Sequence, residues 1–193
     1  DEDLAMCEHA GVDVVLFPCR DDVYADQYRF QMSETKESRL MEGAHRPGHF
    51  TGVLTIVLKL LLLTQAKRVY MGEKDYQQYE LVRDMVKALF IDCEIIACPT
   101  VRESSGLAMS SRNSRLNADQ KQLSARLNQI IKKAKHCDDA RLQLEMIGFE
   151  VDYVHDYHGR RYVAATIGSV RLIDNIVISE SDVQTKRKES IYE

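Results

Sequence analysis

Apolar positions in the first half of the chain form short runs that alternate with longer amphipathic stretches. Three runs have the length and content of buried β strands: residues 12–18, 68–71 and 93–98. Three stretches show the apolar spacing of helices: residues 1–10, 50–65 and 76–90. Strands that alternate with helices are typical of a parallel sheet with helices on its faces. We therefore expect an α/β fold in which residues 1–100 form part of a doubly wound, Rossmann-like parallel sheet.

The pattern changes near residue 100, where helices are followed by strands without alternation. Two stretches read as helices, residues 117–134 and 138–147, and three later runs are β-rich: residues 149–154, 162–167 and 171–178. Asn117 and Gln120 match the two ends of a capping box. We expect residues 101–193 to form a small α+β lid domain with an antiparallel sheet.

The sequence does not decide the structure of one segment in the first half. Residues 33–43 are strongly charged and have no clean period, so they could be a mobile loop or a short helix.

Composition and charge narrow the classes of function. The 193 residues are 45% hydrophobic and 29% charged, as in an ordinary globular protein. A net charge of −4 argues against a nucleic-acid partner, which would require a basic field. The most apolar run, residues 53–63, is too short to span a bilayer and contains Lys59, so no membrane partner is expected. No signal-peptide pattern opens the sequence, which favours a cytoplasmic location.

Cysteine and histidine spacing gives no metal signature. The five cysteines are odd in number and lack CxxC spacing, which favours reduced thiols. His136, Cys137, His155 and His158 match no standard zinc spacing, so we expect no protein-bound metal site. The basic cluster at residues 186–188 precedes an acidic residue and is expected to be a solvated tail.

The loop at residues 102–113 carries the first candidate chemistry. Ser110 and Ser111 lie next to Arg112, and Gly106 permits a close backbone approach. A guanidinium presents a planar fork to two phosphate oxygens, and serine hydroxyls add short neutral donors. An ordinary solvated turn would have a similar composition.

A second candidate loop, residues 72–78, follows directly after a predicted strand. Ligands bind at the carboxyl ends of strands in α/β folds, and Lys74 supplies a point charge for phosphate there. Asp75 is placed to cap the next helix, whose free N–H groups favour an anion. An exposed Lys74–Asp75 ion pair is the alternative interpretation.

Arg46 and His49 flank a Pro-Gly turn that leads into a helix. His49 could be a hydrogen-bonded structural histidine, and Arg46 could bind an anion or be solvated.

Four segments together closely resemble the pantothenate synthetase family. They are residues 72–78 (GEKDYQQ), 99–103 (PTVRE), 106–113 (GLAMSSRN) and 46–50 (RPGHF) with Gly52 and Val53. The resemblance keeps one register from Asp1 to about Ile178. It implies a pantoate–β-alanine ligase of pantothenate biosynthesis, on the coenzyme A pathway, that consumes ATP and forms AMP. Pantoate, β-alanine and ATP are the implied substrates, with Mg²⁺ bridging phosphate oxygens, in a cytoplasmic homodimer.

The resemblance also assigns roles to residues. ATP binding is implied for residues of both loops: Gly72, Glu73, Lys74, Asp75, Val101, Met109, Ser110, Ser111 and Arg112. Within this set the residues that would bind the phosphates are Lys74, Ser110, Ser111 and Arg112, which are the implied catalytic residues. Gly72 and Asp75 would contact the ribose, and Val101 and Met109 would help form the adenine pocket. Gln78 would hydrogen-bond pantoate, and Arg46 and His49 would lie near β-alanine or face the cleft.

The sequence departs from the family at its start. Members carry an earlier strand–turn–helix with a His-x-Gly-His-like motif and a pantoate-binding glutamine, which are not found in this sequence. We therefore expect the chain as given to be incomplete and poorly active alone. A truncated, non-catalytic nucleotide-binding module and another adenylyltransferase of the same superfamily are the alternatives. Gln78 and the 46–50 segment argue against the latter.

Overall fold

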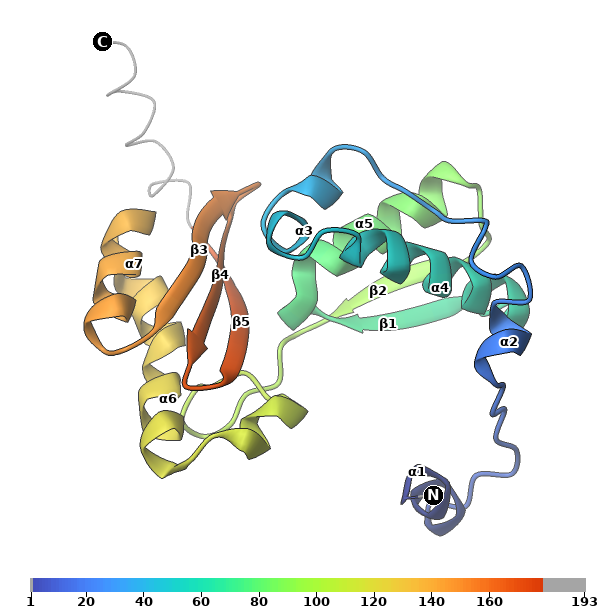
Figure 1. The fold of residues 1–193 in the computed structure, drawn as a ribbon, viewed down its shortest axis with the longest axis horizontal. Coiled ribbons are helices and arrows are strands. Elements are labelled where there is room, and N and C mark those ends of the chain that lie inside the picture. Colours follow the sequence, from blue (N-terminus) through green and yellow to red (C-terminus); the bar gives the residue numbers. More distant parts are fainter. Residues whose placement is uncertain (1, 179–193) are drawn as a thin grey trace.

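Two separate sheets organise residues 2–178, the residues that the computed structural model describes (Figure 1). The first half contains α1 (Glu2–His9), α2 (Arg20–Val23), α3 (Glu42–His45), α4 (His49–Thr64), β1 (Arg68–Gly72), α5 (Tyr76–Ala88) and β2 (Glu94–Cys98). The second half contains α6 (Ala118–Lys133), α7 (Cys137–Met146), β3 (Glu150–Tyr157), β4 (Arg160–Ile167) and β5 (Val170–Val177). Short 3-10 turns lie at η1 (Glu37–Arg39), η2 (Glu73–Asp75) and η3 (Ser111–Arg115). The mixed α/β class predicted from the sequence is confirmed.

The first sheet is a parallel pair in which β1 lies beside β2. Val69 and Ile95 are opposite each other in the ladder, and both pack against a core built mainly from α4 and α5. Phe50 and Leu81 belong to that core. The other face is open, since Tyr70 is 64% exposed. β1 is therefore covered on one face, whereas the sequence predicted a fully buried strand.

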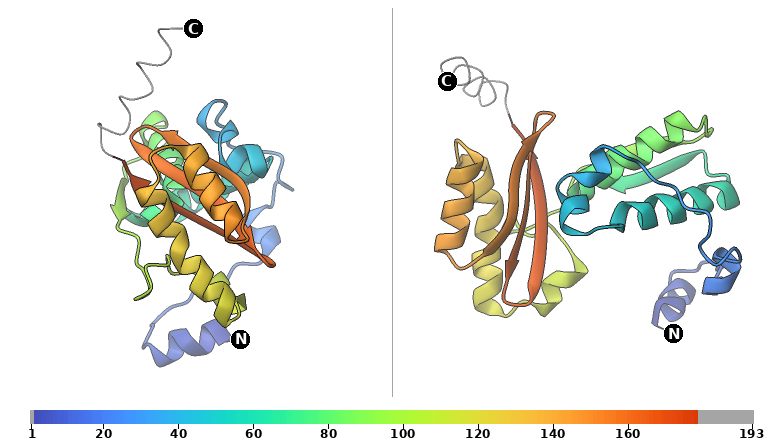
Figure 2. Two further views of the ribbon diagram at one scale, coloured as in Figure 1. Left: turned by 90° about the vertical axis from the view of Figure 1, so that its left-hand side faces the viewer. Right: turned by 45° about the horizontal axis from the view of Figure 1, so that its top comes forward.

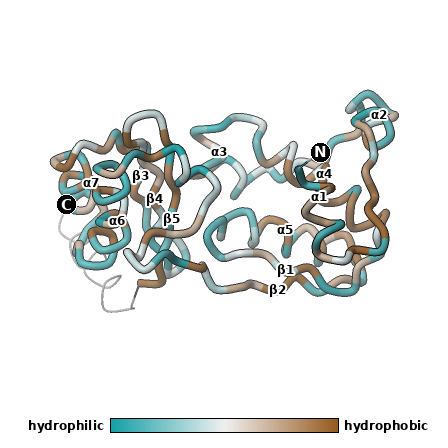
Figure 3. The backbone as a smooth tube through the Cα atoms, turned by 90° about the horizontal axis from the view of Figure 1, so that it is seen from below, coloured by the Kyte–Doolittle hydropathy of each residue, from teal (hydrophilic) through white to brown (hydrophobic). Residues whose placement is uncertain are grey.

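The apolar run at residues 12–18 does not form the strand that was predicted. It has no β assignment, and Phe17 is 79% exposed. A strand requires a neighbouring strand to satisfy its N–H and C=O groups, and no strand within residues 2–178 pairs with this run. Figure 3 shows the hydropathy of this region and of the rest of the chain. Apolar sequence alone did not distinguish a strand from an unpaired extended segment.

The second sheet is antiparallel, with strand order β3–β4–β5. Figures 1 and 2 show α6 and α7 on the face that points away from the first half. Leu127 and Ile131 of α6, Leu144 of α7 and Val163 of β4 are fully buried together. The predicted antiparallel sheet backed by two helices is thus confirmed, with strands slightly longer than expected.

Local signals set several of the element boundaries. Gly11 and Gly148 have positive φ after α1 and α7, as predicted for helix ends. The Asn117 side chain accepts from the N–H of Gln120 at 2.9 Å, and the Gln120 side chain accepts from the N–H of Asn117 at 3.0 Å. The predicted capping box is present. The undecided segment at residues 33–43 contains η1 and the start of α3.

Three further expectations concern a membrane span, the basic cluster and the division of the chain. No helix within residues 2–178 is long and apolar enough to cross a membrane. The basic cluster at residues 186–188 lies outside the described residues. The division at residue 100 stays a prediction.

Candidate functional site

Two adjacent pockets lie where the first half meets the second sheet. The first pocket is lined by His49, Lys74, Asp75, Gln78, Tyr162, Asn175 and neighbouring residues. The second pocket is lined by Lys74, Leu107, Ser110, Arg112, Asn113, Leu172 and neighbouring residues. Lys74, Ile173 and Asp174 line both pockets. An ammonium group therefore stands at the boundary between the two loops that the sequence singled out.

The loop that carries Lys74 begins where β1 ends at Gly72 and continues through η2 into α5. The Lys74 side chain is largely buried, and its Nζ is 3.9 Å from the carboxylate of Asp75. At that distance the ion pair is weak, so the ammonium keeps donor capacity for a ligand. Asp75 occupies the N-cap position of α5, but its side chain makes no capping hydrogen bond. The expectation that Asp75 caps the helix with its side chain was wrong, because its carboxylate faces the pocket and Lys74.

The loop that carries Arg112 is braced from within. Glu103 N–H donates to the carbonyl of Leu107 at 2.8 Å, which closes a tight turn through Gly106, at φ +90°. The buried Asn113 amide donates to the Glu103 carboxylate at 2.7 Å and to the Ala108 carbonyl at 3.1 Å. These bonds hold the turn that leads to Arg112, whose side chain lines the second pocket.

Ser110 fixes the start of η3. Its hydroxyl accepts from the N–H of Arg112 at 3.3 Å, in the manner of an N-cap. Ser111 and Arg112 are exposed. Hydroxyl, backbone and guanidinium donors thus come from three consecutive residues.

Arg46 and His49 lie beside the first pocket. The Arg46 Nη1 atom is 3.3 Å from His49 Nε2 and 3.6 Å from the Glu42 carboxylate. Burial and the Arg46 charge lower the pKa of His49 below its usual value, although nearby carboxylates oppose them. Because a guanidinium only donates, Nε2 is the acceptor in this pair. His49 is therefore neutral at pH 7.

Glu42 joins the first half to the second sheet. Its carboxylate accepts from Arg171 at 2.7 and 3.0 Å and from the Tyr153 hydroxyl at 2.9 Å. Burial alone would raise the pKa of Glu42, but the hydrogen bonds and charge of Arg171 outweigh it and hold the pKa below its usual value. Burial and the Glu42 charge raise the pKa of Tyr153, so its hydroxyl remains a donor.

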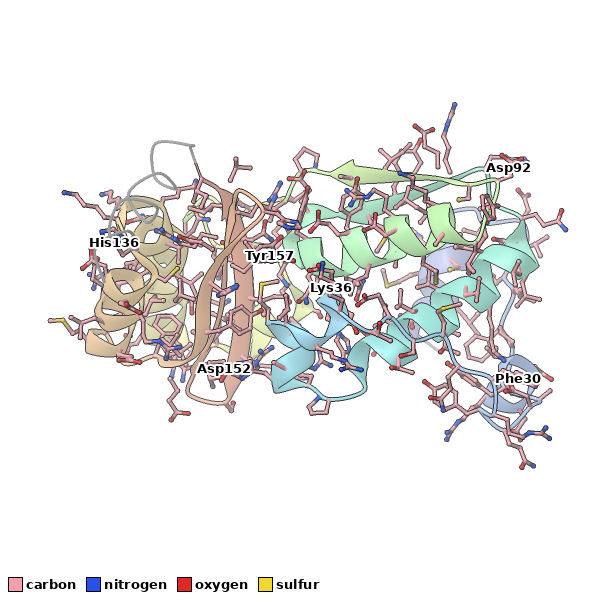
Figure 4. The ribbon with its side chains drawn as sticks, turned by 90° about the horizontal axis from the view of Figure 1, so that it is seen from above. Phe30, Lys36, Asp92, His136, Asp152 and Tyr157 are labelled. Atoms are coloured by element: carbon pink, nitrogen blue, oxygen red, sulfur yellow. The ribbon has the colours of Figure 1, made fainter. Side chains whose placement is uncertain are left out.

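A second bridge lies at the tip of the β3–β4 hairpin. The Tyr157 hydroxyl donates to Glu37 in η1, and this bond and the carboxylate charge raise the pKa of Tyr157 to about 12. Figure 4 shows Tyr157 near Lys36, where the hairpin approaches the first half. The pockets are thus flanked by polar bridges that hold the halves together.

The structure brings many of the predicted site residues together but not all of them. His49, Lys74, Asp75 and Gln78 line the first pocket, and Ser110 and Arg112 join Lys74 in the second. The remaining predicted residues line neither pocket: Arg46, Gly72, Glu73, Val101, Met109 and Ser111. Val101 and Met109 are more than half exposed, yet they are adjacent, since Met109 N–H donates to the Val101 carbonyl at 3.0 Å. The roles of these residues stay predictions.

Sequence reasoning missed the polar residues of β5. Arg171, Asp174 and Asn175 interrupt a strand whose other residues are mainly apolar. Asp174 and Asn175 are only 4% exposed. Buried polar side chains in a strand require partners, so their presence in residues 170–177 was a usable signal.

The donor set suits phosphate better than a bare metal ion. No group of three or more His, Cys, Asp or Glu side chains within the described part of the chain could hold a metal. The one carboxylate on both pockets, Asp174, is already paired with Arg102 at 2.7 Å. A Mg²⁺ ion would have to take most of its ligands from phosphate oxygens and water.

Comparison with known proteins accounts for this arrangement. The model of the family described as pantoate-beta-alanine ligase matches residues 1–177. The chain belongs to the pantoate–β-alanine ligase family. Pantothenate synthetase from Legionella pneumophila (strain Lens) is 48% identical over 178 residues, which are 92% of this chain and 71% of that protein. Pantothenate synthetase from Coxiella burnetii (strain Dugway 5J108-111) is 47% identical over 175 residues, 91% of this chain and 68% of that one.

Solved structures of the family have the same fold. Pantoate-beta-alanine ligase from Francisella tularensis, crystallised in a complex described as containing beta-gamma ATP and beta-alanine, superposes with a TM-score of 0.82 at 36% identity. The match covers 91% of this chain and 69% of that one. Pantothenate synthetase from Thermus thermophilus superposes with a TM-score of 0.80 at 35% identity, over 91% and 73% of the two chains. The family predicted from four short segments is therefore confirmed.

Proposed function

We propose that the protein joins pantoate to β-alanine at the expense of ATP through a pantoyl-adenylate intermediate. The position of Lys74 carries the proposal. One ammonium lies between a pocket that holds Gln78 and His49 and a pocket that holds Ser110 and Arg112. A triphosphate beside Lys74 would thus meet the carboxylate of an organic acid bound in the neighbouring pocket.

The reaction has two steps. A pantoate carboxylate oxygen attacks the α-phosphorus of ATP, an O–P bond forms, and the bond to the leaving pyrophosphate breaks. The β-alanine amine, in its unprotonated form, then attacks the acyl carbon, an amide bond forms, and AMP leaves. Negative charge builds up on phosphate oxygens in the first step, so fixed cations and donors are what catalysis requires.

The residues divide this work by position. Lys74, Ser110, Ser111 and Arg112 bind the phosphates as charged and neutral donors. Gly72, Glu73 and Asp75 lie along the ribose side, and Val101 and Met109 offer apolar contact to the adenine. A Mg²⁺ ion held by phosphate oxygens would neutralise charge on the leaving pyrophosphate.

The organic substrates are assigned to the first pocket. Gln78 hydrogen-bonds pantoate through its amide. Arg46 lies within 3.3 Å of His49 and offers a charge to the β-alanine carboxylate. A cytoplasmic homodimer belongs to the same proposal, and sedimentation of the purified protein would test the dimer.

An isotope experiment with the full-length protein tests the intermediate. Pantoate labelled with ¹⁸O in its carboxylate is incubated with ATP, Mg²⁺ and β-alanine, and the products are analysed by mass spectrometry. We expect pantothenate and AMP in equal amounts, with one ¹⁸O atom transferred to AMP. Formation of ADP and labelled phosphate would overturn the adenylate route.

Substitution of Lys74 tests the site itself. Lys74→Gln removes the charge at the pocket boundary and should lower kcat/KM for ATP by about 100-fold or more. Lys67→Gln is the matched control, because Lys67 is an exposed lysine that forms a surface ion pair with Asp92. Equal activity of the two variants would contradict the assignment. ATP binding without turnover in the unaltered protein would instead favour a non-catalytic nucleotide-binding module.

A further inference from the structure

Asp174 and Asn175 are consecutive residues of β5, and both are buried where the two halves meet. Burying a carboxylate and an amide is costly unless every polar atom finds a partner. Successive side chains of a strand point to opposite faces, so the two residues can reach two different partners. Their partners belong to the two loops of the candidate site.

Asn175 holds the loop that carries Lys74. Its Nδ2 atom donates to the carbonyl of Glu73 at 2.8 Å and to the carbonyl of Lys74 itself at 3.0 Å. Arg160 donates to the Asn175 Oδ1 atom, which fixes the orientation of the amide and leaves Nδ2 to face the loop. The Arg160 guanidinium also lies 3.6 Å from the ring centroid of Tyr76 and 3.3 Å from the Glu73 carboxylate. The backbone of Lys74 is thus bound from the sheet.

Asp174 holds the loop that carries Ser110 and Arg112. Its two carboxylate oxygens accept from the Arg102 guanidinium at 2.7 and 2.9 Å, in a bidentate pair. Arg102 also donates to the carbonyl of Gly106 at 3.1 Å, inside the same loop. The Asn128 amide of α6 donates a further hydrogen bond to the Asp174 carboxylate at 2.9 Å. The loop is therefore attached to β5 one residue away from the attachment of the Lys74 loop.

We propose that Asp174 and Asn175 are positioning residues that set the separation between Lys74 and the 110–112 donors. The proposal rests on the proposed function, because it assigns a purpose to the spacing of the same phosphate site. The backbone N–H of Asn175 donates to the Asp174 carboxylate at 2.8 Å, which links the two attachments directly. Neither residue needs to touch a reacting atom. They act through the backbone of Lys74 and through the guanidinium of Arg102.

A substitution that keeps the shape of the side chain but exchanges its amide donor for a negatively charged carboxylate oxygen separates positioning from packing. Asn175→Asp keeps the size of the side chain and the acceptor for Arg160, but it replaces the donor to the Glu73 and Lys74 carbonyls with an oxygen that repels them. Asn117→Asp is the matched control. It makes the same chemical change in the same half of the protein, and aspartate still caps α6.

The measurements use the full-length protein below its unfolding temperature. We expect Asn175→Asp to weaken ATP binding in calorimetry and to lower kcat/KM for ATP by about 10- to 100-fold, because small misplacements of a charged group have effects of that size. KM for β-alanine should change less than about threefold, since Arg46, which is assigned to its carboxylate, makes none of the bonds that the substitution removes. The Asn117→Asp control should match the unaltered protein in all three quantities.

A double substitution gives a readout that loss of stability would not produce. If Asn175 acts through Lys74, then adding Asn175→Asp to Lys74→Gln should lower kcat/KM for ATP by less than about threefold beyond Lys74→Gln alone. If the two substitutions instead lower kcat/KM for ATP independently, so that their fold-changes multiply in the double variant, the proposal is overturned. Asp174→Asn is a second test variant if Asn175→Asp fails to fold. It should raise KM for ATP, because it weakens the attachment of the 102–112 loop.

The outcomes distinguish this inference from the function on which it rests. If the unaltered protein turns over ATP, and Asn175→Asp and Asp174→Asn bind ATP as it does, the positioning role is wrong and the proposed function stands. If the unaltered protein neither binds nor turns over ATP, the proposed function fails first.

Discussion

Gly43 lies in α3 beside the carbonyl oxygen of Ser38, so close that a Cβ atom built on it would be 1.7 Å from that oxygen. The same atom would be 3.2 Å from the ring of Phe50. The glycine is required by space, since its φ is not positive. Glu42, the residue that joins the two halves, is its immediate neighbour.

We predict that Gly43→Ala lowers the free energy of unfolding by about 2 kcal/mol or more, because the backbone of η1 would have to move. Chemical denaturation measures the change. Gly52→Ala is the control, since its Cβ would meet only the Tyr28 hydroxyl at 3.6 Å. Inside α4 that substitution should be neutral or stabilise by up to about 1 kcal/mol. A Gly43→Ala protein with unchanged stability would show that the backbone around Ser38 can move at little cost in free energy.

Residues of the candidate site differ in how far the sequence alone predicts them. Lys74, Ser110 and Arg112 lie in loops whose composition already indicates an anion site, and the structure places all three on one pocket. Asp174 and Asn175 could not be assigned in this way. Their partners are residues such as Glu73 and Arg102, about 70 to 100 positions away along the chain, and only tertiary packing brings them together.

At the scale of elements, the capping box of α6 offers the sharpest test. Asn117→Ala removes the side chain that accepts from the Gln120 N–H, so it should lower the free energy of unfolding by about 1 kcal/mol. Thermal unfolding followed by circular dichroism would measure the loss. Asn117→Asp should retain the stability of the unaltered protein, and equal losses in both variants would contradict a capping role.

Elements were predicted well where their signals are local. The ends of α6 and α7 follow from Asn117 and Gly148, and the amphipathic spacing identified both helices. The strand predicted at residues 12–18 was wrong because a strand is defined by a partner, which no local pattern supplies. The bridges that flank the pockets, such as Tyr157 to Glu37, were likewise invisible before the halves were seen together.

At the scale of the whole molecule, we propose that the chain divides near residues 100 and 101 into two domains. Each side has its own sheet and its own main hydrophobic cluster. The two sides meet at an apolar cluster that includes Met41, Tyr153 and Tyr162. Polar bonds of Glu42 and Asn175 join the sides next to it. Polar contacts of this kind couple the two parts and make the coupling sensitive to pH.

Glu42 makes that pH dependence measurable. Its pKa in the folded protein is held below the usual value near 4.5, so its contribution to stability is present above that value and is lost as the pH falls through the folded pKa. Glu42→Gln should lower the free energy of unfolding by about 1–3 kcal/mol at pH 7. The difference from the unaltered protein should shrink below about pH 4.5.

Denaturation of both proteins across pH 3 to 7 tests this expectation. Glu94→Gln serves as the control, since Glu94 forms an exposed pair with Arg68 at 3.4 Å and should cost less than about 0.5 kcal/mol. A Glu42→Gln penalty of constant size over the whole pH range would mean that packing, not charge, is what Glu42 contributes.

The wall that the two pockets share at Lys74, Ile173 and Asp174 bears on inhibitor design. Two fragments, each selected for one pocket, could be connected by a short tether that runs beside this wall, and the second fragment would then bind at the high effective concentration that the tether creates. The tether itself would need an acceptor opposite the ammonium, because covering that charge with hydrocarbon would forfeit much of the gain.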